Sequence, residues 1–215
     1  MTLVDALAKF NRKERYWLVR NALGEASKTL DPYFLDQLQE LGIAVPRDAW
    51  WAMDYHFDWL AGALHLYQSG GQADAVLQNE EGIVKGNQED LDLIVAFDDT
   101  LVLIEAKGDS SWDVEQLDSK RRRLLACFGD QAERLALRVF FVFMSTGARP
   151  VVTDWPSWAL DPQGRPNWLN MRMAEKGQEA AFYRVVRCSD AKGTVGEVGK
   201  YWKIVSPAAR KTVTT

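Results

Sequence analysis

Two apolar segments separated by only two aspartates constrain the fold of this chain more than any other feature. Residues 90–97 and 100–107 have the composition of β-strands. The connection between them consists of Asp98 and Asp99 alone, which is the length of a two-residue hairpin turn. A two-residue turn fixes the register, because the residues on either side of it must pair. Paired positions then sum to 197 along the whole hairpin.

This register brings acidic side chains face to face. Asp92 lies opposite Glu105 and Asp90 opposite Lys107. Because side chains alternate along a strand, Asp92, Glu105 and Lys107 share one face. Like charges directly opposite destabilise a sheet unless a cation or a raised pKa compensates. A divalent ion, Mg²⁺ or Mn²⁺, would supply that cation, and Lys107 could orient or help deprotonate a metal-bound water or stabilise phosphate charge.

The flanking segments predict the remaining elements. Apolar spacing is helical over most of the first seventy residues and favours one helix from 46 to 68, with a core stripe that includes Trp50, Met53 and Phe57. The other predicted strands are at 75–85, Val139–Met144, which is fully buried, Phe182–Cys188 and Lys200–Val205. A helix capped by Ser110 and Ser111 follows the hairpin, with an apolar-face stripe at Val114, Leu117, Arg121, Leu124 and Phe128.

These elements divide the chain into three regions. Residues 1–45 form an N-terminal helical extension, 46–146 an α/β core, and 147–215 a tryptophan- and proline-rich loop followed by a C-terminal β appendage. We expect the appendage to pack on the core, giving a single domain overall. The predicted order within the core is helix, three strands, helix, strand.

The core resembles the PD-(D/E)xK phosphodiesterase superfamily, which has the restriction-endonuclease-like fold. Three features carry the resemblance: Asp92 before the apolar run 93–95, the triplet Glu105-Ala106-Lys107 thirteen residues later, and the helix and apolar strand that follow. The resemblance implies an αβββαβ core with a mixed central sheet flanked by helices. It also implies that Asp92, Glu105 and the backbone carbonyl of Ala106 bind the metal, while Lys107 assists the attacking water.

Two further catalytic positions follow from the resemblance. Many members place a polar residue early on the helix after the triplet, and Gln116 fits that place. The family often adds an acid from the first helix, for which Asp58 is the candidate and Asp54 the reserve. Leu91 stands where the name-giving proline would be, so Asp90 competes with Asp92 as the ligand, and strand alternation favours Asp92. Glu80 or Glu81 is a further optional ligand, although such a pair is more often a solvated turn.

Candidate substrate contacts lie on the helix after the hairpin and in the aromatic loop. Lys120 and Arg121 belong to the basic run 120–123, which could hold phosphates or form a solvated helix face. Trp112, beside the proposed site, is a candidate for stacking on bases, as are Trp155 and Trp158 in the loop.

The charge distribution is compatible with a nucleic-acid partner despite a net charge of −4. Residues 1–118 carry 9 basic and 22 acidic side chains, whereas 119–215 carry 17 and 8. The acidic excess peaks around the proposed metal site, and the basic half could hold a phosphate backbone.

Other features exclude some classes of protein. Cys127 and Cys188 lack zinc-ligand spacing, no apolar run is long enough to span a bilayer, and no signal peptide is evident, so we expect a cytoplasmic protein with no membrane partner.

The sequence therefore predicts a metal-dependent nuclease acting on DNA in preference to RNA, with a homodimer left open. The alternatives are a catalytically inactive member of the same fold that binds nucleic acid or protein, and an interaction module built on the N-terminal helices and the aromatic loop.

Overall fold

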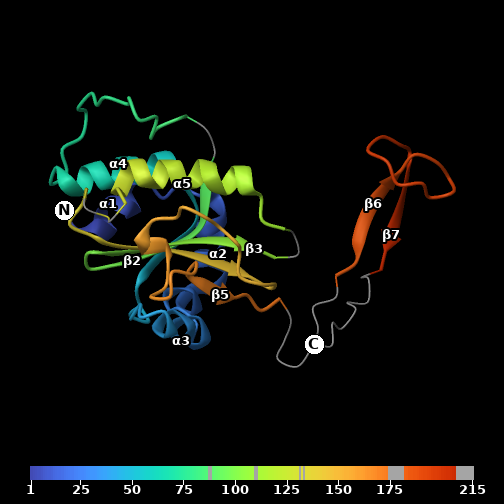
Figure 1. The fold of residues 1–215 in the computed structure, drawn as a ribbon, viewed down its shortest axis with the longest axis horizontal. Coiled ribbons are helices and arrows are strands. Elements are labelled where there is room, and N and C mark those ends of the chain that lie inside the picture. Colours follow the sequence, from blue (N-terminus) through green and yellow to red (C-terminus); the bar gives the residue numbers. More distant parts are fainter. Residues whose placement is uncertain (87–88, 109–110, 131, 133, 174–181, 207–215) are drawn as a thin grey trace. The chain divides into compact units, whose positions relative to one another are not determined.

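A computed structural model describes residues 1–86, 89–108, 111–130, 132, 134–173 and 182–206. The chain divides into two compact units, residues 1–171 and 172–215. The first unit holds a five-stranded mixed sheet with helices on both faces (Figure 1). The α/β class predicted from the sequence is therefore confirmed at this level.

The strand order in the sheet is β1-β2-β3-β4-β5. The strands are β1 (Trp50–His56), β2 (Asp90–Phe97), β3 (Thr100–Lys107), β4 (Arg138–Ser145) and β5 (Trp168–Asn170). β2 is antiparallel to both β1 and β3, whereas β3, β4 and β5 run parallel to one another. The carboxyl ends of three neighbouring strands consequently lie at one edge of the sheet.

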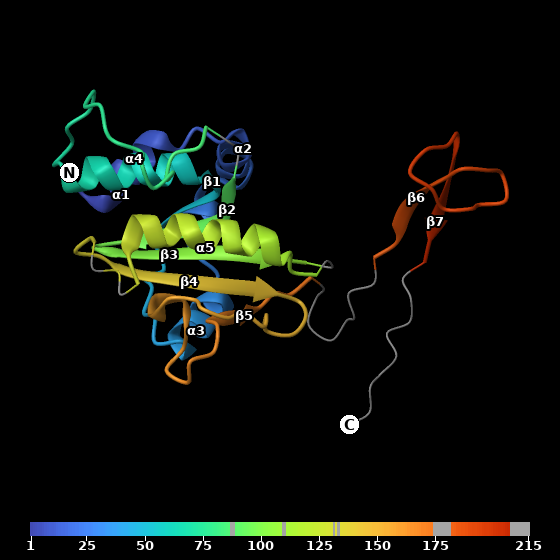
Figure 2. The ribbon, with the colours of Figure 1, turned by 45° about the horizontal axis from the view of Figure 1, so that its top comes forward.

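Helices cover the two faces unequally. α1 (Leu3–Phe10), α4 (Phe57–Gln68) and α5 (Val114–Phe128) lie on one face, and α3 (Pro32–Glu40) lies on the other (Figures 1 and 2). α2 (Glu14–Leu23) and the short 3₁₀ helices η1 (Gly24–Lys28) and η2 (Ser157–Ala159) complete the unit. Each face of the sheet buries its own apolar cluster, so the strands are apolar on both sides.

The hairpin formed by β2 and β3 has the register expected from its two-residue turn. Phe97 pairs with Thr100 and Leu93 with Ile104, so paired positions sum to 197. Asp98 in the turn has a φ of 43°, a left-handed conformation that Asp tolerates better than most residues. The paired ladder extends as far as Leu93 and Ile104.

The helix predicted from 46 to 68 is wrong in its first half. Residues 50–56 form β1, and helix α4 begins only at Phe57. Ala52 and Tyr55 are the buried residues of β1, and their separation of three positions mimics helical spacing. Pairing with β2 and the aromatic content of the segment favour the strand, and Asp54, with a φ of 50°, adopts a conformation that no α-helix contains.

The strand predicted at 75–85 is also absent from this described segment. Asn79 instead satisfies the backbone locally, since its side chain accepts from the Val84 N–H at 3.1 Å and donates to the Val84 carbonyl at 2.7 Å. The N–H of Gly82 closes a turn on the Asn79 carbonyl. The core order is therefore strand, helix, two strands, helix, strand, and the αβββαβ order implied by the resemblance is not observed.

Helix α5 starts later than predicted. Its N-cap is Asp113, whose carboxylate accepts from the backbone N–H of Gln116 at 3.1 Å. Ser111 is exposed and outside the helix, and Ser110 lies outside the described residues. The aromatic loop belongs to the first unit, where it contributes η2 and the edge strand β5.

The second unit contains a hairpin of β6 (Arg184–Cys188) and β7 (Tyr201–Val205), close to the two strands predicted there. Across the described residues of the chain, none of the helices has both the length and the apolarity that crossing a membrane requires.

Candidate functional site

The residues expected to carry chemistry meet where β2 begins, β3 ends and α5 passes over them. Glu105 is only 2% exposed and forms an ion pair with Lys120 of α5, which is equally buried. The ammonium of Lys120 also donates to the backbone carbonyl of Asp90 at 2.7 Å. A buried lysine therefore supplies a compensating cation for Glu105.

Glu105 is the carboxyl whose titration this environment changes most clearly. Burial raises the pKa of Glu105 to about 7, and the negative charge of Asp92 acts in the same direction. Lys120, through its charge and its hydrogen bond, and Lys107, through its charge, lower the pKa and offset part of the rise. Glu105 therefore interacts electrostatically with both Asp92 and Lys107, as expected if the three side chains lie on one face of the hairpin.

Asp92 is held against the end of β3. Its carboxylate accepts from the backbone N–H of Ala106 at 2.6 Å, at the point where the β2–β3 ladder stops. The N–H of Arg138 bonds to the carbonyl of Asp99, so odd-numbered residues of β3 direct their backbone groups toward β4. The carbonyl of Ala106 therefore points toward β2, on the side of Asp92.

Lys107 lies at the accessible side of the same cluster. Its ammonium is 3.3 Å from the side-chain oxygen of Gln116, the polar residue expected early on the helix. Lys107 is half-buried and Gln116 is exposed, so this pair lies nearer to solvent than Glu105 does. The structure thus brings together Asp92, Glu105, Ala106, Lys107 and Gln116.

The donor set suits a hard cation that keeps much of its coordination for water or substrate. Among the described residues there is no group of three or more His, Cys, Asp or Glu side chains that could hold a metal ion. Asp92 nevertheless lies against the end of β3, where it accepts from the N–H of Ala106, and its charge acts on Glu105. Mg²⁺ is usually held by one or two carboxylates with waters and substrate phosphates, so Asp92, Glu105 and the carbonyl of Ala106 are the available protein ligands. A bound ion would share the Glu105 carboxylate with Lys120.

Other acids considered in the sequence lie elsewhere. Asp90 is ion-paired with Lys13 at 2.9 Å and lies 2.6 Å from the ring nitrogen Nδ1 of His56, so it faces β1 rather than Lys107. The predicted pairing of Asp90 with Lys107 is therefore not observed. Asp92 is the acid next to Glu105.

Asp58 does not reach this cluster. Its carboxylate pairs with the buried guanidinium of Arg123 and accepts from the backbone N–H groups of Lys85 and Gly86. Arg123 also pairs with Glu89 at 2.9 Å and donates to the carbonyl of Ile83 at 3.1 Å. Asp58 thus anchors the segment before β2 to helix α5.

The remaining optional acids have separate environments. Asp54 pairs with Arg15 at 3.1 Å, Glu81 pairs with Arg134 at 2.7 Å, and Glu80 is exposed.

The basic run on α5 is divided between the interior and the surface. Lys120 and Arg123 are buried, so neither of them holds phosphates at the surface or belongs to a solvated helix face. Arg121 is half-buried and bonded to Asp118 and to the carbonyl of Asp154. The predicted stripe is wrong at Val114, which is 75% exposed, and at Arg121, because Lys120 and Arg123 occupy the sheet-facing side of α5 instead.

The tryptophans proposed as substrate contacts are mostly core residues. Trp155 and Trp158 are buried, and Trp158 donates to the carbonyl of Gly129 at 2.9 Å. Trp112 is half-buried and packs edge-on against Phe143, with 5.3 Å between ring centroids. These rings fill the space beside α5 rather than forming an open stacking surface.

The main residue that the sequence analysis missed is Lys120 as the partner of Glu105. Its signal was its spacing, three positions after Leu117 and four before Leu124, which places it on the buried face of the helix. A charged residue on a buried face requires a buried partner, and Glu105 was available.

Comparisons of the chain with protein-family models, with curated proteins and with solved structures found no match.

Proposed function

We propose that this protein is a divalent-metal-dependent nuclease that hydrolyses phosphodiester bonds of nucleic acid, DNA in preference to RNA, on a restriction-endonuclease-like fold. The observation that carries the proposal is the position of Asp92, Glu105 and Lys107 at the open end of the β2–β3 hairpin, where Asp92 accepts from the N–H of Ala106 and the charges of Asp92 and Lys107 act on Glu105. The antiparallel hairpin, the following helix α5 and the parallel strand β4 support the fold assignment.

Each residue of the cluster has a definable task. Asp92 and Glu105, with the carbonyl of Ala106, would hold Mg²⁺ or Mn²⁺, which supplies Lewis acidity and a more acidic bound water when present. Lys107, half-buried and hydrogen-bonded to Gln116, would orient the attacking water or offset charge that develops on the phosphate. Lys120 would position the Glu105 carboxylate.

The test is cleavage of single- and double-stranded DNA and of RNA, with and without Mg²⁺ or Mn²⁺. We expect cleavage that requires the metal and is abolished by Asp92→Ala and by Lys107→Ala. Asp98→Asn is the matched control, because it neutralises an exposed acid in the turn at the other end of the same hairpin. Wild-type protein that neither cleaves any of these substrates nor binds Mn²⁺ would refute the proposal.

One observation favours a second function, a catalytically inactive member of the fold that binds nucleic acid or protein. Glu105 is deeply buried and already paired with Lys120, so its negative charge is compensated without a metal. This alternative predicts nucleic-acid affinity that neither a chelator nor Glu105→Gln changes, in a protein without cleavage activity.

A further inference from the structure

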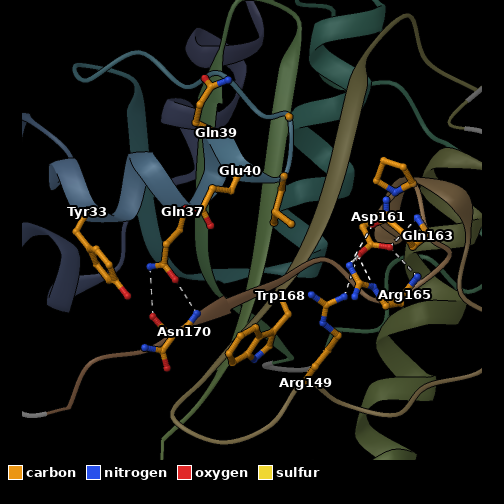
Figure 3. Close-up of a pocket in the computed structure, with 13 residues that line it drawn as sticks. Tyr33, Gln37, Gln39, Glu40, Arg149, Asp161, Gln163, Arg165, Trp168 and Asn170 are labelled. Atoms are coloured by element: carbon orange, nitrogen blue, oxygen red, sulfur yellow. Dashed lines mark hydrogen bonds and ion pairs between the residues drawn. The ribbon is translucent and has the colours of Figure 1, made fainter.

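A cavity of about 700 Å³ opens beside the edge strand β5, between helix α3 and the loop that precedes β5. Figure 3 shows arginines and Trp168 on one side and polar side chains of α3 on the other. This volume lies within the range of small-molecule binding sites. It is separate from Asp92 and Glu105, which are not among its lining residues.

Two arginines are held together at one end of the cavity by a single buried carboxylate. Asp161, whose side chain is 4% exposed, accepts from Arg149 at 2.9 Å and from Arg165 at 2.9 Å. Burial raises the pKa of Asp161, but hydrogen bonds from Arg165, Arg149 and the backbone of Gln163 outweigh it, and the pKa falls well below its usual range. Asp161 therefore stays ionised and orients both guanidiniums.

The charge of this group does not cancel. Two guanidiniums face one carboxylate, which leaves one excess positive charge at this end of the cavity, while Glu40 supplies a negative charge on the α3 side. Arg165 keeps more than half of its side-chain surface exposed, and Arg149 about a quarter. Guanidinium groups bind phosphate oxygens through paired N–H donors, so this end of the cavity suits a phosphoryl group.

The rest of the cavity suits a planar polar ring. Trp168 is half-buried, and its indole N–H donates to the hydroxyl of Ser145 at 2.9 Å, which fixes the ring in place. Gln37 bonds both backbone groups of Asn170, at 2.8 and 3.3 Å, and so covers the open edge of β5. Glu40 lies on the α3 side, away from the arginines, where a carboxylate could accept from an amino group of a base (Figure 3).

The sheet register connects this cavity with the candidate catalytic cluster. Lys107 of β3 pairs with Ser145 of β4, and Ser145 pairs with Asn170 of β5. These three residues lie in one row at the carboxyl ends of parallel strands. Trp168 reaches this row through its hydrogen bond to Ser145. A nucleic-acid strand that passes Lys107 could therefore continue along this edge toward the arginines.

We propose that the cavity binds one nucleoside phosphate, with the phosphoryl group at Arg149 and Arg165 and the base against Trp168. The occupant is either a unit of the substrate strand or a free nucleotide. The strand-unit form rests on the proposed nuclease function, whereas binding of a free nucleotide does not.

The test is calorimetric titration of the full chain with AMP, adenosine and a short single-stranded DNA oligonucleotide, without metal so that cleavage does not interfere. We expect AMP or the oligonucleotide to bind at least tenfold more tightly than adenosine. Arg165→Gln and Trp168→Leu should each weaken that binding about tenfold or more, and the arginine variant should also lower its salt dependence. Arg122→Gln is the matched control, because it removes an exposed arginine of α5 outside the cavity.

The outcomes separate the two proposals. Binding of the oligonucleotide but not of AMP, with the same response to the variants, identifies a strand unit. If the variants weaken AMP binding but the protein has no nuclease activity, the cavity still binds a nucleotide. That result excludes only a unit of a substrate strand as the occupant. The inference is overturned if neither AMP nor the oligonucleotide binds the wild-type protein, or if Arg165→Gln, folded as judged by thermal unfolding, binds them as tightly as Arg122→Gln does.

Discussion

Replacement of Lys120 by methionine tests the electrostatic design of the site. Lys120 and Glu105 form a buried ion pair, and Lys120→Met keeps the length and apolar stem of the side chain while removing the ammonium. The Glu105 carboxylate then has no cation in direct contact. Removal of one partner of a buried pair typically costs about 3–5 kcal/mol, because an uncompensated charge remains.

The size of this effect should depend on pH. Burial and Asp92 raise the pKa of Glu105 from 4.5 to about 7. As the pH rises, the unfolded chain therefore loses this proton at a lower pH than the folded protein does. The wild-type protein therefore gains stability from this group below about pH 4.5 and loses it as the pH rises toward 7. Without Lys120 the pKa rises further, and the loss continues to higher pH.

Thermal unfolding of the wild-type and variant proteins at pH 5 and pH 8 measures this difference. At pH 8 a cost of about 3–5 kcal/mol corresponds to a decrease in Tm of roughly 6–20 °C for a unit of this size, with a clearly smaller decrease at pH 5. The double variant Lys120→Met with Glu105→Leu should recover most of the loss, because both buried charges are gone. An equal decrease at both pH values, or no recovery in the double variant, would refute this reasoning.

Two further substitutions test neighbouring contacts. Asp92→Asn removes the negative charge beside Glu105 while keeping an oxygen that accepts from the backbone N–H of Ala106. The pKa of Glu105 should then fall below about 7 in a carbon-detected NMR titration. An unchanged pKa would show that the two carboxyls do not interact. Tyr55→Phe removes the buried hydroxyl that donates to the carbonyl of Leu7 at 2.9 Å, and denaturant unfolding should show a loss of about 1–3 kcal/mol, whereas an unchanged midpoint would contradict a buried bond at this position.

The β2–β3 hairpin could be predicted because its information is local. Two strands joined by a two-residue turn have few alternative registers, because a shift would require a different turn length. The positions of Asp92, Glu105 and Lys107 on one face follow directly from that register. The same local logic located α5 and the parallel strand β4.

The misassigned segments depend on distant partners. Strand β1 has apolar spacing compatible with a helix, and it becomes a strand because it pairs with β2, which follows it by more than thirty residues. The spacing of Lys120 on α5 indicates that it is buried, but only the folded structure shows that its partner is Glu105 of β3. Asp58 also depends on a distant partner, because its carboxylate pairs with Arg123 of α5, sixty-five positions later.

A crystal structure of the full chain grown or soaked with Mn²⁺ would show whether Asp92 and Glu105 bind a metal ion. We expect one ion between their carboxylates, with the carbonyl of Ala106 as a further ligand, and loss of that ion in Asp92→Ala. Mn²⁺ absent from this position at concentrations well above those needed for other protein sites, with Glu105 still paired only to Lys120, would contradict this expectation.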